Sequence, residues 1–363
     1  MTIALNSPVV PDIARLTQYL EQVNESGHYT NFGPLHQELT RRLEEYLGVE
    51  NLLLISNGTL ALQVVYKVLG ITRAVTTPFS FVATTSSLLW QGIDTQFCDI
   101  DKYTYNLSPS KVQDALTSDP GIDGVVATHV YGNPCDVETF EDIARKNDVK
   151  VVYDAAHAFG IKVGEQSVLN FGDASILSFH ATKVFHTVEG GAIVFKRKED
   201  YEKAKQLINF AIYNGEITDV GINAKLNEYQ CAVGLTVLDN IDQILAHRAE
   251  LFATYTENLS HIVTLPKWHS LANTNGAYFP ICLESEDALA LVASELAKSD
   301  IQYRPYFKPS LDSVFPQVKY DNLDISRDIS NRVLCLPLHF NLTKADVLKV
   351  SAAVERGLLC RVQ

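Results

Sequence analysis

The sequence predicts an α/β fold in which a mostly parallel sheet is covered by helices on both faces. Two observations carry this prediction. Short, continuous apolar segments recur along the N-terminal half of the chain, and segments with helical spacing of apolar residues separate them. Apolar runs without an alternating polar side suit strands that are buried on both faces, as parallel strands between helices are. Functional polar groups in such a fold gather beyond the carboxyl ends of the strands.

The first unit of this pattern is a helix followed by a strand, a turn and a second helix. Apolar residues recur at helical spacing over 35–47, and Gly48 follows as a helix stop. The chain then reads as a buried strand over 51–55. A turn at 56–59 leads into a helix that begins near Leu60.

The same alternation continues along the chain, with further strands and helices predicted at 74–77, 81–92, 124–128, 137–147, 149–153, 174–179 and 192–195. A helical pattern covers 201–257, where a long helix would join the large domain to a second one. A small α+β domain follows, with elements predicted at 278–283, 287–298, 333–336 and 344–357. We therefore expect a large domain over 1–240 and a small domain over 241–363.

Composition places the chain among ordinary globular proteins, since its 363 residues are 46% hydrophobic and 20% charged. Thirty basic and 43 acidic residues give a formal charge of −13, which disfavours binding to nucleic acid. The sequence shows no signal peptide and no apolar stretch long enough to span a membrane. These features predict a cytoplasmic protein with no membrane partner. Six scattered cysteines are interpreted as reduced core residues: Cys98, Cys135, Cys231, Cys282, Cys335 and Cys360.

Neither a dinucleotide-binding fingerprint nor a P-loop is present in the sequence. Three other features are candidates for the chemistry. The turn Ser56-Asn57-Gly58-Thr59 would expose backbone N–H groups at a helix start, where they can bind phosphate; such turns also occur as plain helix caps. Asp154 follows an apolar strand and could merely cap the next segment. Lys183 follows another strand and could be a solvated surface lysine. Together they are the groups that pyridoxal phosphate needs: a phosphate site, an acid for the pyridine nitrogen and a lysine for a Schiff base.

At several further positions the chain resembles the DegT/DnrJ/EryC1/StrS family of sugar aminotransferases, which use pyridoxal phosphate. The matching segments are Asn31–Pro34, Ser56–Leu62, Thr77–Thr84, Asp154–Gly160, Ser178–Lys183, Glu189–Gly191, Gly221–Asn223 with Glu228–Gln230, and Cys335–His339. They run in the family's order over nearly the whole chain. The resemblance implies the aspartate aminotransferase fold (fold type I), with a mostly parallel seven-stranded sheet in the large domain and a small α+β C-terminal domain.

The resemblance also implies residue roles. Lys183 and Asp154 are the candidate catalytic residues, with Lys183 bound covalently to the cofactor and Asp154 at its pyridine nitrogen. The remaining candidate cofactor-binding residues are Gly58, Thr59 and Ser178 at the phosphate, Phe81 stacked on the ring, His157 near O3′, and Asn223 from the other subunit at the phosphate. Phe81 could instead be a plain core aromatic, and Asn223 could instead cap the helix that follows it. No metal is implied.

The implied function is transfer of an amino group from L-glutamate to a nucleotide-linked ketosugar by a homodimer with shared active sites. The segments 154–160 and 179–183 favour dTDP-4-dehydro-6-deoxy-D-glucose, which would give dTDP-4-amino-4,6-dideoxy-D-glucose for lipopolysaccharide O-antigen. Two alternatives stay open: an aminotransferase for dTDP-3-dehydro-6-deoxyhexose, and a non-catalytic regulator that binds the cofactor. A metal hydrolase built from Asp154, His157, His180 and His186 is a further interpretation, although it gives Lys183 no role.

Three departures from the family pattern concern the substrate more than the chemistry. His157 stands where many relatives have Gln, so its pKa and tautomer are new variables. The loop Tyr303–Leu311 lacks a histidine that is usual before the C-terminal motif. Lys225 stands where Arg is common and keeps the charge without the bidentate guanidinium. The identity of the ketosugar therefore stays open at this point.

Overall fold

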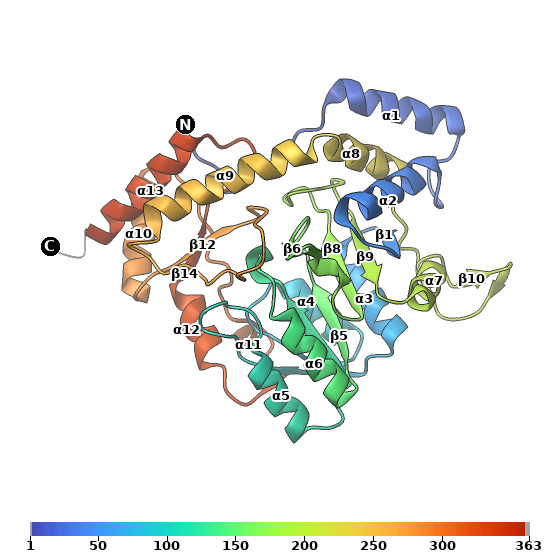
Figure 1. The fold of residues 1–363 in the computed structure, drawn as a ribbon, viewed down its shortest axis with the longest axis horizontal. Helices are drawn as coiled ribbons and strands as arrows, with labels where there is room; N and C mark the ends of the chain where they lie inside the picture. Colours follow the sequence, from blue (N-terminus) through green and yellow to red (C-terminus); the bar gives the residue numbers. More distant parts are fainter. Residues whose placement is uncertain (1, 360–363) are drawn as a thin grey trace.

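We describe residues 2–359 of a computed structural model of the chain, drawn as a ribbon in Figure 1. A central sheet lies between helices, and the long helix α9 (Ile241–Leu259) runs from α8 (Glu228–Leu238) toward α10 (Glu286–Lys298) and α13 (Lys344–Leu359). The described part of the chain contains no helix that is both long and apolar enough to cross a bilayer.

Eight strands form the central sheet of the described residues. In spatial order they are β1 (Leu52–Ile55), β9 (Gly191–Phe195), β8 (Ala174–Ser178), β5 (Lys150–Asp154), β4 (Gly124–Thr128), β2 (Arg73–Thr76), β3 (Asp94–Phe97) and β13 (Lys319–Tyr320). Strand β9 runs antiparallel to β1 and β8, and all other neighbouring pairs of the sheet are parallel, so the sheet is mostly parallel, as predicted. Seven of these strands lie within residues 1–240, as predicted for the large domain, and the eighth is the two-residue strand β13 from the C-terminal part, which pairs with β3 at the edge.

Both faces of the sheet are buried because neighbouring strand residues point into different hydrophobic clusters. Val125 belongs to one cluster and Val126 to the other, and the same holds for Val151 and Val152. The first cluster is closed by α8 and by α1 (Ile13–Ser26), α2 (Pro34–Leu47), α5 (Pro109–Ser118) and α6 (Val137–Asn147). The second is closed by α3 (Gly58–Leu69), α4 (Val82–Trp90) and α7 (Lys198–Leu207). The predicted α/β arrangement with helices on both faces is thus confirmed.

The C-terminal part has a hydrophobic cluster of its own, which the second half of α9 enters through Leu251, Tyr255 and Leu259. The cluster is formed by the antiparallel pair β12 (Phe279–Cys282) and β14 (Val333–Leu336) together with α10 and α13. The helices α11 (Leu311–Val314) and α12 (Asp324–Arg332) also belong to this part of the chain. Ile3 from the other end of the chain also packs here. The domain boundary after residue 240 stays a prediction.

The region 201–257 differs from the expected continuous helical pattern. Between α7 and α8 the chain forms a hairpin of β10 (Ile212–Tyr213) and β11 (Glu216–Ile217), which projects from the body of the protein beside α7 in Figure 1. Asn214 and Gly215 take positive φ angles of 50° and 84° at its turn, as a tight hairpin requires. The other short elements are β6 (Lys162–Val163), β7 (Gln166–Ser167), and the single-turn helices η1 (Val130–Gly132) and η2 (Val168–Asn170).

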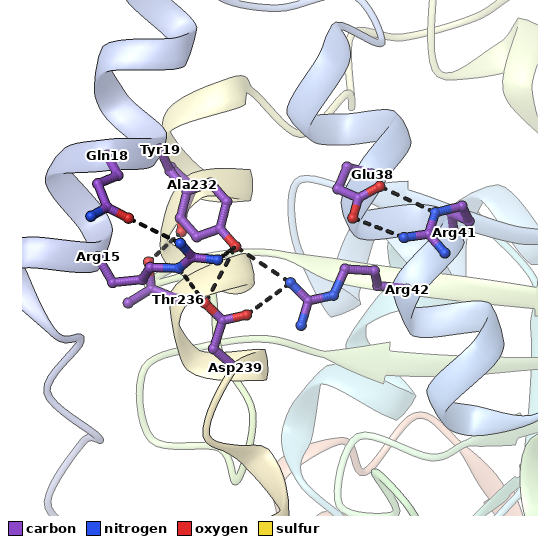
Figure 2. Close-up of polar contacts among 9 residues, drawn as sticks. All are labelled: Arg15, Gln18, Tyr19, Glu38, Arg41, Arg42, Ala232, Thr236 and Asp239. Carbon is purple, nitrogen blue, oxygen red and sulfur yellow. Dashed lines mark hydrogen bonds and ion pairs between the residues drawn. The ribbon is translucent and has the colours of Figure 1, made fainter.

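One carboxylate ties the N-terminal helices to the end of α8, close to the predicted domain boundary. Asp239 accepts from Arg15 of α1 and Arg42 of α2, each at 2.8 Å, and Tyr19 lies between them at 3.3 Å (Figure 2). The two guanidinium groups compensate the partly buried carboxylate, so α1, α2 and α8 are held at one point.

The cysteine prediction is confirmed for five positions. Cys98, Cys135, Cys231, Cys282 and Cys335 are free and buried. Cys360 lies outside the described residues.

Candidate active site

The predicted phosphate-binding turn is the N-terminus of α3. Asn57 is its N-cap, and the Asn57 side chain accepts from the Leu60 N–H at 2.9 Å. Gly58 and Thr59 line a cavity of about 330 Å³, and their backbone N–H groups, in the first turn of the helix, have no intrahelical acceptor. A Cβ on Gly58 would lie 3.2 Å from the Ser178 Cβ, so glycine keeps this end of the helix close to the end of β8.

Gly191 on β9 lies close to the backbone of the same turn. A Cβ there would come within 2.7 Å of the Leu177 carbonyl oxygen and 3.0 Å of the Gly58 nitrogen. No side chain fits between β8 and the start of α3, which gives Gly191 of the motif Glu189-Gly190-Gly191 a structural reason.

Asp154 is the last residue of β5 and is buried, with 4% of its surface exposed. Its carboxylate accepts from the Thr84 hydroxyl at 2.7 Å and from the Ala156 N–H at 3.1 Å. Burial raises the pKa of Asp154, while these two hydrogen bonds and the nearby Lys183 oppose the rise. The acid thus has partners for its charged form and also lines the cavity.

Lys183 lies in the loop between β8 and β9, whose next residues, Val184 and Phe185, are buried in the core. This anchoring places the Lys183 side chain on the cavity wall. Burial lowers the pKa of Lys183 from 10.5 to about 8, and the Asp154 carboxylate partly opposes the shift. The amine therefore gives up its proton far more readily than a surface lysine does.

Two aromatic rings of the predicted set take different places. Phe81, the N-cap of α4, is 51% exposed and lines the cavity, so the plain-core interpretation is wrong. His157 is buried, and its Nδ1 has no hydrogen-bond partner. Burial, followed by the charge of Lys183, lowers the pKa of His157 well below its usual value. The imidazole is thus neutral at pH 7, with a polar atom that lacks a partner.

The opposite wall comes from the C-terminal part of the chain, including the loop Tyr303–Leu311 that the sequence linked to the substrate without giving any of its residues a role. Tyr278, Arg304, Tyr306 and Phe307 line the cavity there, and His157 contacts Tyr278 with ring centroids 4.7 Å apart. Thr84 was also missed as a functional residue, although it stands in a segment that matches the family. The feature that could have identified Thr84 is its position one turn after Phe81, at the start of a helix that faces the strand ends.

The structure therefore brings Gly58, Thr59, Phe81, Asp154, His157, Ser178 and Lys183 into one cavity. Asn223 does not line it. It is exposed, its side-chain oxygen accepts from Lys225 at 2.8 Å, and α8 is capped by Asn227 instead. The helix-cap interpretation of Asn223 is therefore wrong.

The side chains of the metal-hydrolase interpretation have separate partners. His186 contacts the Val9 carbonyl oxygen at 2.8 Å and His180 contacts Thr182 at 2.8 Å, whereas Asp154 bonds to Thr84. Over residues 2–359 no group of three or more His, Cys, Asp or Glu side chains could hold a metal ion. The geometry thus gives this interpretation no support.

Comparison with known proteins places this cavity in a family. Residues 12–355 match the DegT/DnrJ/EryC1/StrS aminotransferase family. The chain belongs to this family. The match covers nearly all of the chain, so the family recognised from the sequence is confirmed. Its enzyme class follows: a sugar aminotransferase that depends on pyridoxal phosphate.

Relatives within the family are similar over their whole length. A dTDP-4-amino-4,6-dideoxy-D-glucose transaminase of Shigella dysenteriae is 39% identical over 98% of this chain and 99% of its own. An Escherichia coli protein of the same name is 33% identical over 96% and 97%. The structure of DesI in the presence of its TDP-sugar product has a TM-score of 0.92 and 28% identity, covering 99% of this chain and 95% of its own. These structural and sequence matches confirm the predicted aminotransferase fold.

Proposed function

We propose that the protein transfers the amino group of L-glutamate to dTDP-4-dehydro-6-deoxy-D-glucose and so forms dTDP-4-amino-4,6-dideoxy-D-glucose. The observation that carries this proposal is the 39% identity, over 98% of the chain, to the Shigella dysenteriae transaminase that bears this product in its name. The Escherichia coli relative of the same name supports it. A role in O-antigen and lipopolysaccharide synthesis follows from that product. The cytoplasmic location stays a prediction.

The residues of the cavity fit pyridoxal phosphate. The first-turn amides of α3 offer N–H donors and a positive helix end for its phosphate, in a turn that a Cβ on Gly58 or Gly191 would crowd. The buried His157 has a ring nitrogen without a partner, which suits a hydrogen bond to a phenolic oxygen. Asp154 offers a carboxylate for a protonated ring nitrogen, and Lys183 offers an amine of lowered pKa.

When bound, pyridoxal phosphate supplies an electron sink for the carbon that loses its proton. Asp154, whose carboxylate Thr84 orients, would hold a proton on the ring nitrogen by a charge-assisted hydrogen bond. Lys183 would hold the cofactor through its amine and, once released from it, would take and return the proton of the reacting carbon. Its pKa of about 8 allows both directions near neutral pH. Phe81 lines the cavity and is half exposed, so its ring would be free to stack on the cofactor.

The test uses two separate reactions of the holoenzyme with L-glutamate. One contains dTDP-4-dehydro-6-deoxy-D-glucose and the other a dTDP-3-dehydro-6-deoxyhexose, and NMR identifies the products. We expect an amine on C4 of the first sugar and no turnover of the second. Lys183→Ala, which should bind cofactor without a covalent link, is the control for enzyme-catalysed transfer. Turnover of the 3-dehydro sugar alone would replace the proposal with a 3-aminotransferase. Cofactor binding without any turnover would indicate a regulator.

We also propose that two copies of the chain share their active sites. The segment before α8 is rich in exposed apolar side chains: Ile217 is 76% exposed and Val220 is 79% exposed. Exposed apolar side chains so close in sequence favour an interaction surface here. Asn223 lies at the end of this segment, exposed and outside its own chain's cavity. In a homodimer its amide could reach the phosphate-binding turn of the partner.

A further inference from the structure

A second cavity lies next to the active-site cavity and has no role in the chemistry above. This side cavity measures about 230 Å³ and is bounded by Leu5 and Asn6 of the N-terminal segment and by Leu336 and Leu338. It shares part of its wall with the active-site cavity, namely Thr182, Tyr278, Arg304 and Tyr306. These shared side chains form the boundary between the two spaces.

Arg304 is the charged residue of this boundary, and both its backbone and its side chain are held by hydrogen bonds. Its backbone forms an isolated bridge with Cys335 next to the end of β14, with N–H to carbonyl distances of 3.2 and 2.7 Å. Its guanidinium donates to the Tyr306 hydroxyl at 2.6 Å and lies 5.1 Å from the centre of that ring. Among the described residues it has no carboxylate partner, since none of the ion pairs involves it. A guanidinium that is fixed in position and has no carboxylate partner is available to bind an anion.

The charges of the two cavities leave Arg304 as the group available for an anionic substrate. Asp154 and Glu189 line the active-site cavity, and the whole chain carries a formal charge of −13. The lysine and arginine side chains of the two walls are Lys183 and Arg304, and Lys183 is committed to the cofactor. Within one chain, Arg304 is therefore the cation left to offset this negative surrounding for an anion that enters here.

Resting on the proposed function, we propose that Arg304 binds the diphosphate of the nucleotide-linked sugar. The sugar then lies in the active-site cavity, and the nucleoside extends toward the side cavity. A ligand with its charges in the middle and an uncharged group at each end matches a guanidinium on the boundary between two spaces. L-Glutamate, the other anionic substrate, is small and would leave the side cavity unused. A guanidinium also suits phosphate oxygens, which it can bind with two parallel hydrogen bonds.

The test uses dTDP as the probe, titrated into the holoenzyme by calorimetry, with the L-glutamate half-reaction followed by the cofactor's absorption change. We expect Arg304→Met to weaken dTDP binding about tenfold or more, the usual effect of losing a hydrogen-bonded charge. Arg304→Lys should lose less, because it keeps a point charge. The glutamate half-reaction should stay within about twofold. Arg145→Met, which removes an exposed arginine of α6, is the matched control.

Wild-type turnover of the dTDP-linked ketosugar is measured first, since its absence would reject the proposed function and this inference with it. With turnover present, unchanged dTDP affinity in Arg304→Met rejects the inference alone. A loss in the glutamate half-reaction as large as the loss in dTDP binding also rejects it, because the residue would then serve the donor. If Arg304→Met loses its cofactor absorption or melts early, Arg304→Lys decides by the same two measurements.

Discussion

The Thr84 hydroxyl donates a 2.7 Å hydrogen bond to the Asp154 carboxylate, and both side chains are buried. Thr84 lies in the first turn of α4 and Asp154 at the end of β5, so two elements far apart in the sequence meet at the candidate catalytic acid. The bond stabilises the ionised form and counters the pKa rise that burial imposes on Asp154. A threonine without a predicted role thereby helps to keep the carboxylate charged.

We predict that Thr84→Val lowers kcat about tenfold and destabilises the fold by roughly 1–3 kcal/mol, since a buried carboxylate oxygen loses its partner. Thr84→Ser keeps the hydroxyl and should restore most of both. Steady-state kinetics and denaturant unfolding of the three proteins check this. Equal kcat in Thr84→Val and wild type would show that Thr84 does not position the acid.

Asp154→Asn separates the role of charge from that of shape. The amide can still bond to Thr84 and to the Ala156 N–H, so the fold should persist. The apoprotein should melt at a higher temperature, because burial penalises the ionised carboxylate. Turnover should fall by roughly a hundredfold or more, as when other preorganised electrostatic contacts of active sites are removed. A fall of less than tenfold would mean that another group holds the ring nitrogen.

Much of the fold could be predicted because its strands are continuous apolar runs and its helices have clear caps. Strand β4 and helix α6, for example, begin and end where the sequence predicts. Strand β3 was missed because Asp94-Thr95-Gln96-Phe97 contains one strongly apolar residue. The β10–β11 hairpin was missed although Asn214-Gly215 is a strong hairpin signal. Its strands are exposed, so hydrophobic periodicity gave no warning.

The cofactor end of the site could be predicted because its residues follow strand ends in sequence. At the substrate end the sequence pointed to the loop Tyr303–Leu311 but did not give a role to any residue in it. Arg304 is held through Cys335, a residue 31 positions later, and its ring partner Tyr306 contacts Tyr278 at 5.7 Å. These contacts join segments whose proximity depends on the packing of β12 against β14, and no local pattern reports it.

The lowered pKa of Lys183 predicts how the apoprotein captures its cofactor. The unprotonated amine is the nucleophile, so the rate of covalent capture should rise about tenfold per pH unit below pH 8 and level off above it. Asp154 raises the pKa of Lys183, so Asp154→Asn should reach the plateau at lower pH. Glu189→Gln removes another carboxylate of the cavity wall, one that does not shift this pKa, and should leave the midpoint unchanged. Stopped-flow absorption measures the rates; a midpoint near 10 would contradict the prediction.

The same pKa shift predicts a pH effect on the stability of the apoprotein. Between about pH 8 and 10.5 the unfolded chain binds a proton at Lys183 that the folded chain does not. The contribution of this residue to the free energy of unfolding should therefore increase with pH in that window. Lys183→Met should remove this contribution, which denaturant unfolding at pH 7.5 and 10.5 would show.

The shared-site proposal predicts complementation between two variants that are each defective by themselves. Asn223→Ala should be impaired by itself, because the amide it offers to a phosphate is lost. If Asn223 serves the partner's site, a dimer of one Lys183→Ala chain and one Asn223→Ala chain has one site with both defects and one site with neither. Such a mixed dimer should regain about half of wild-type activity.

The control for this experiment is a mixture of Lys183→Ala with Asp154→Asn. Lys183 and Asp154 line one cavity of the same chain, so each site of that mixed dimer keeps one defect and no activity should return. Differently tagged chains, co-purified through both tags, establish that mixed dimers have formed. If those dimers carry Lys183→Ala and Asn223→Ala and remain inactive, Asn223 acts within its own chain and the sites are not shared through this residue. Recovery confined to the Asn223 mixture has no explanation in a site built from one chain.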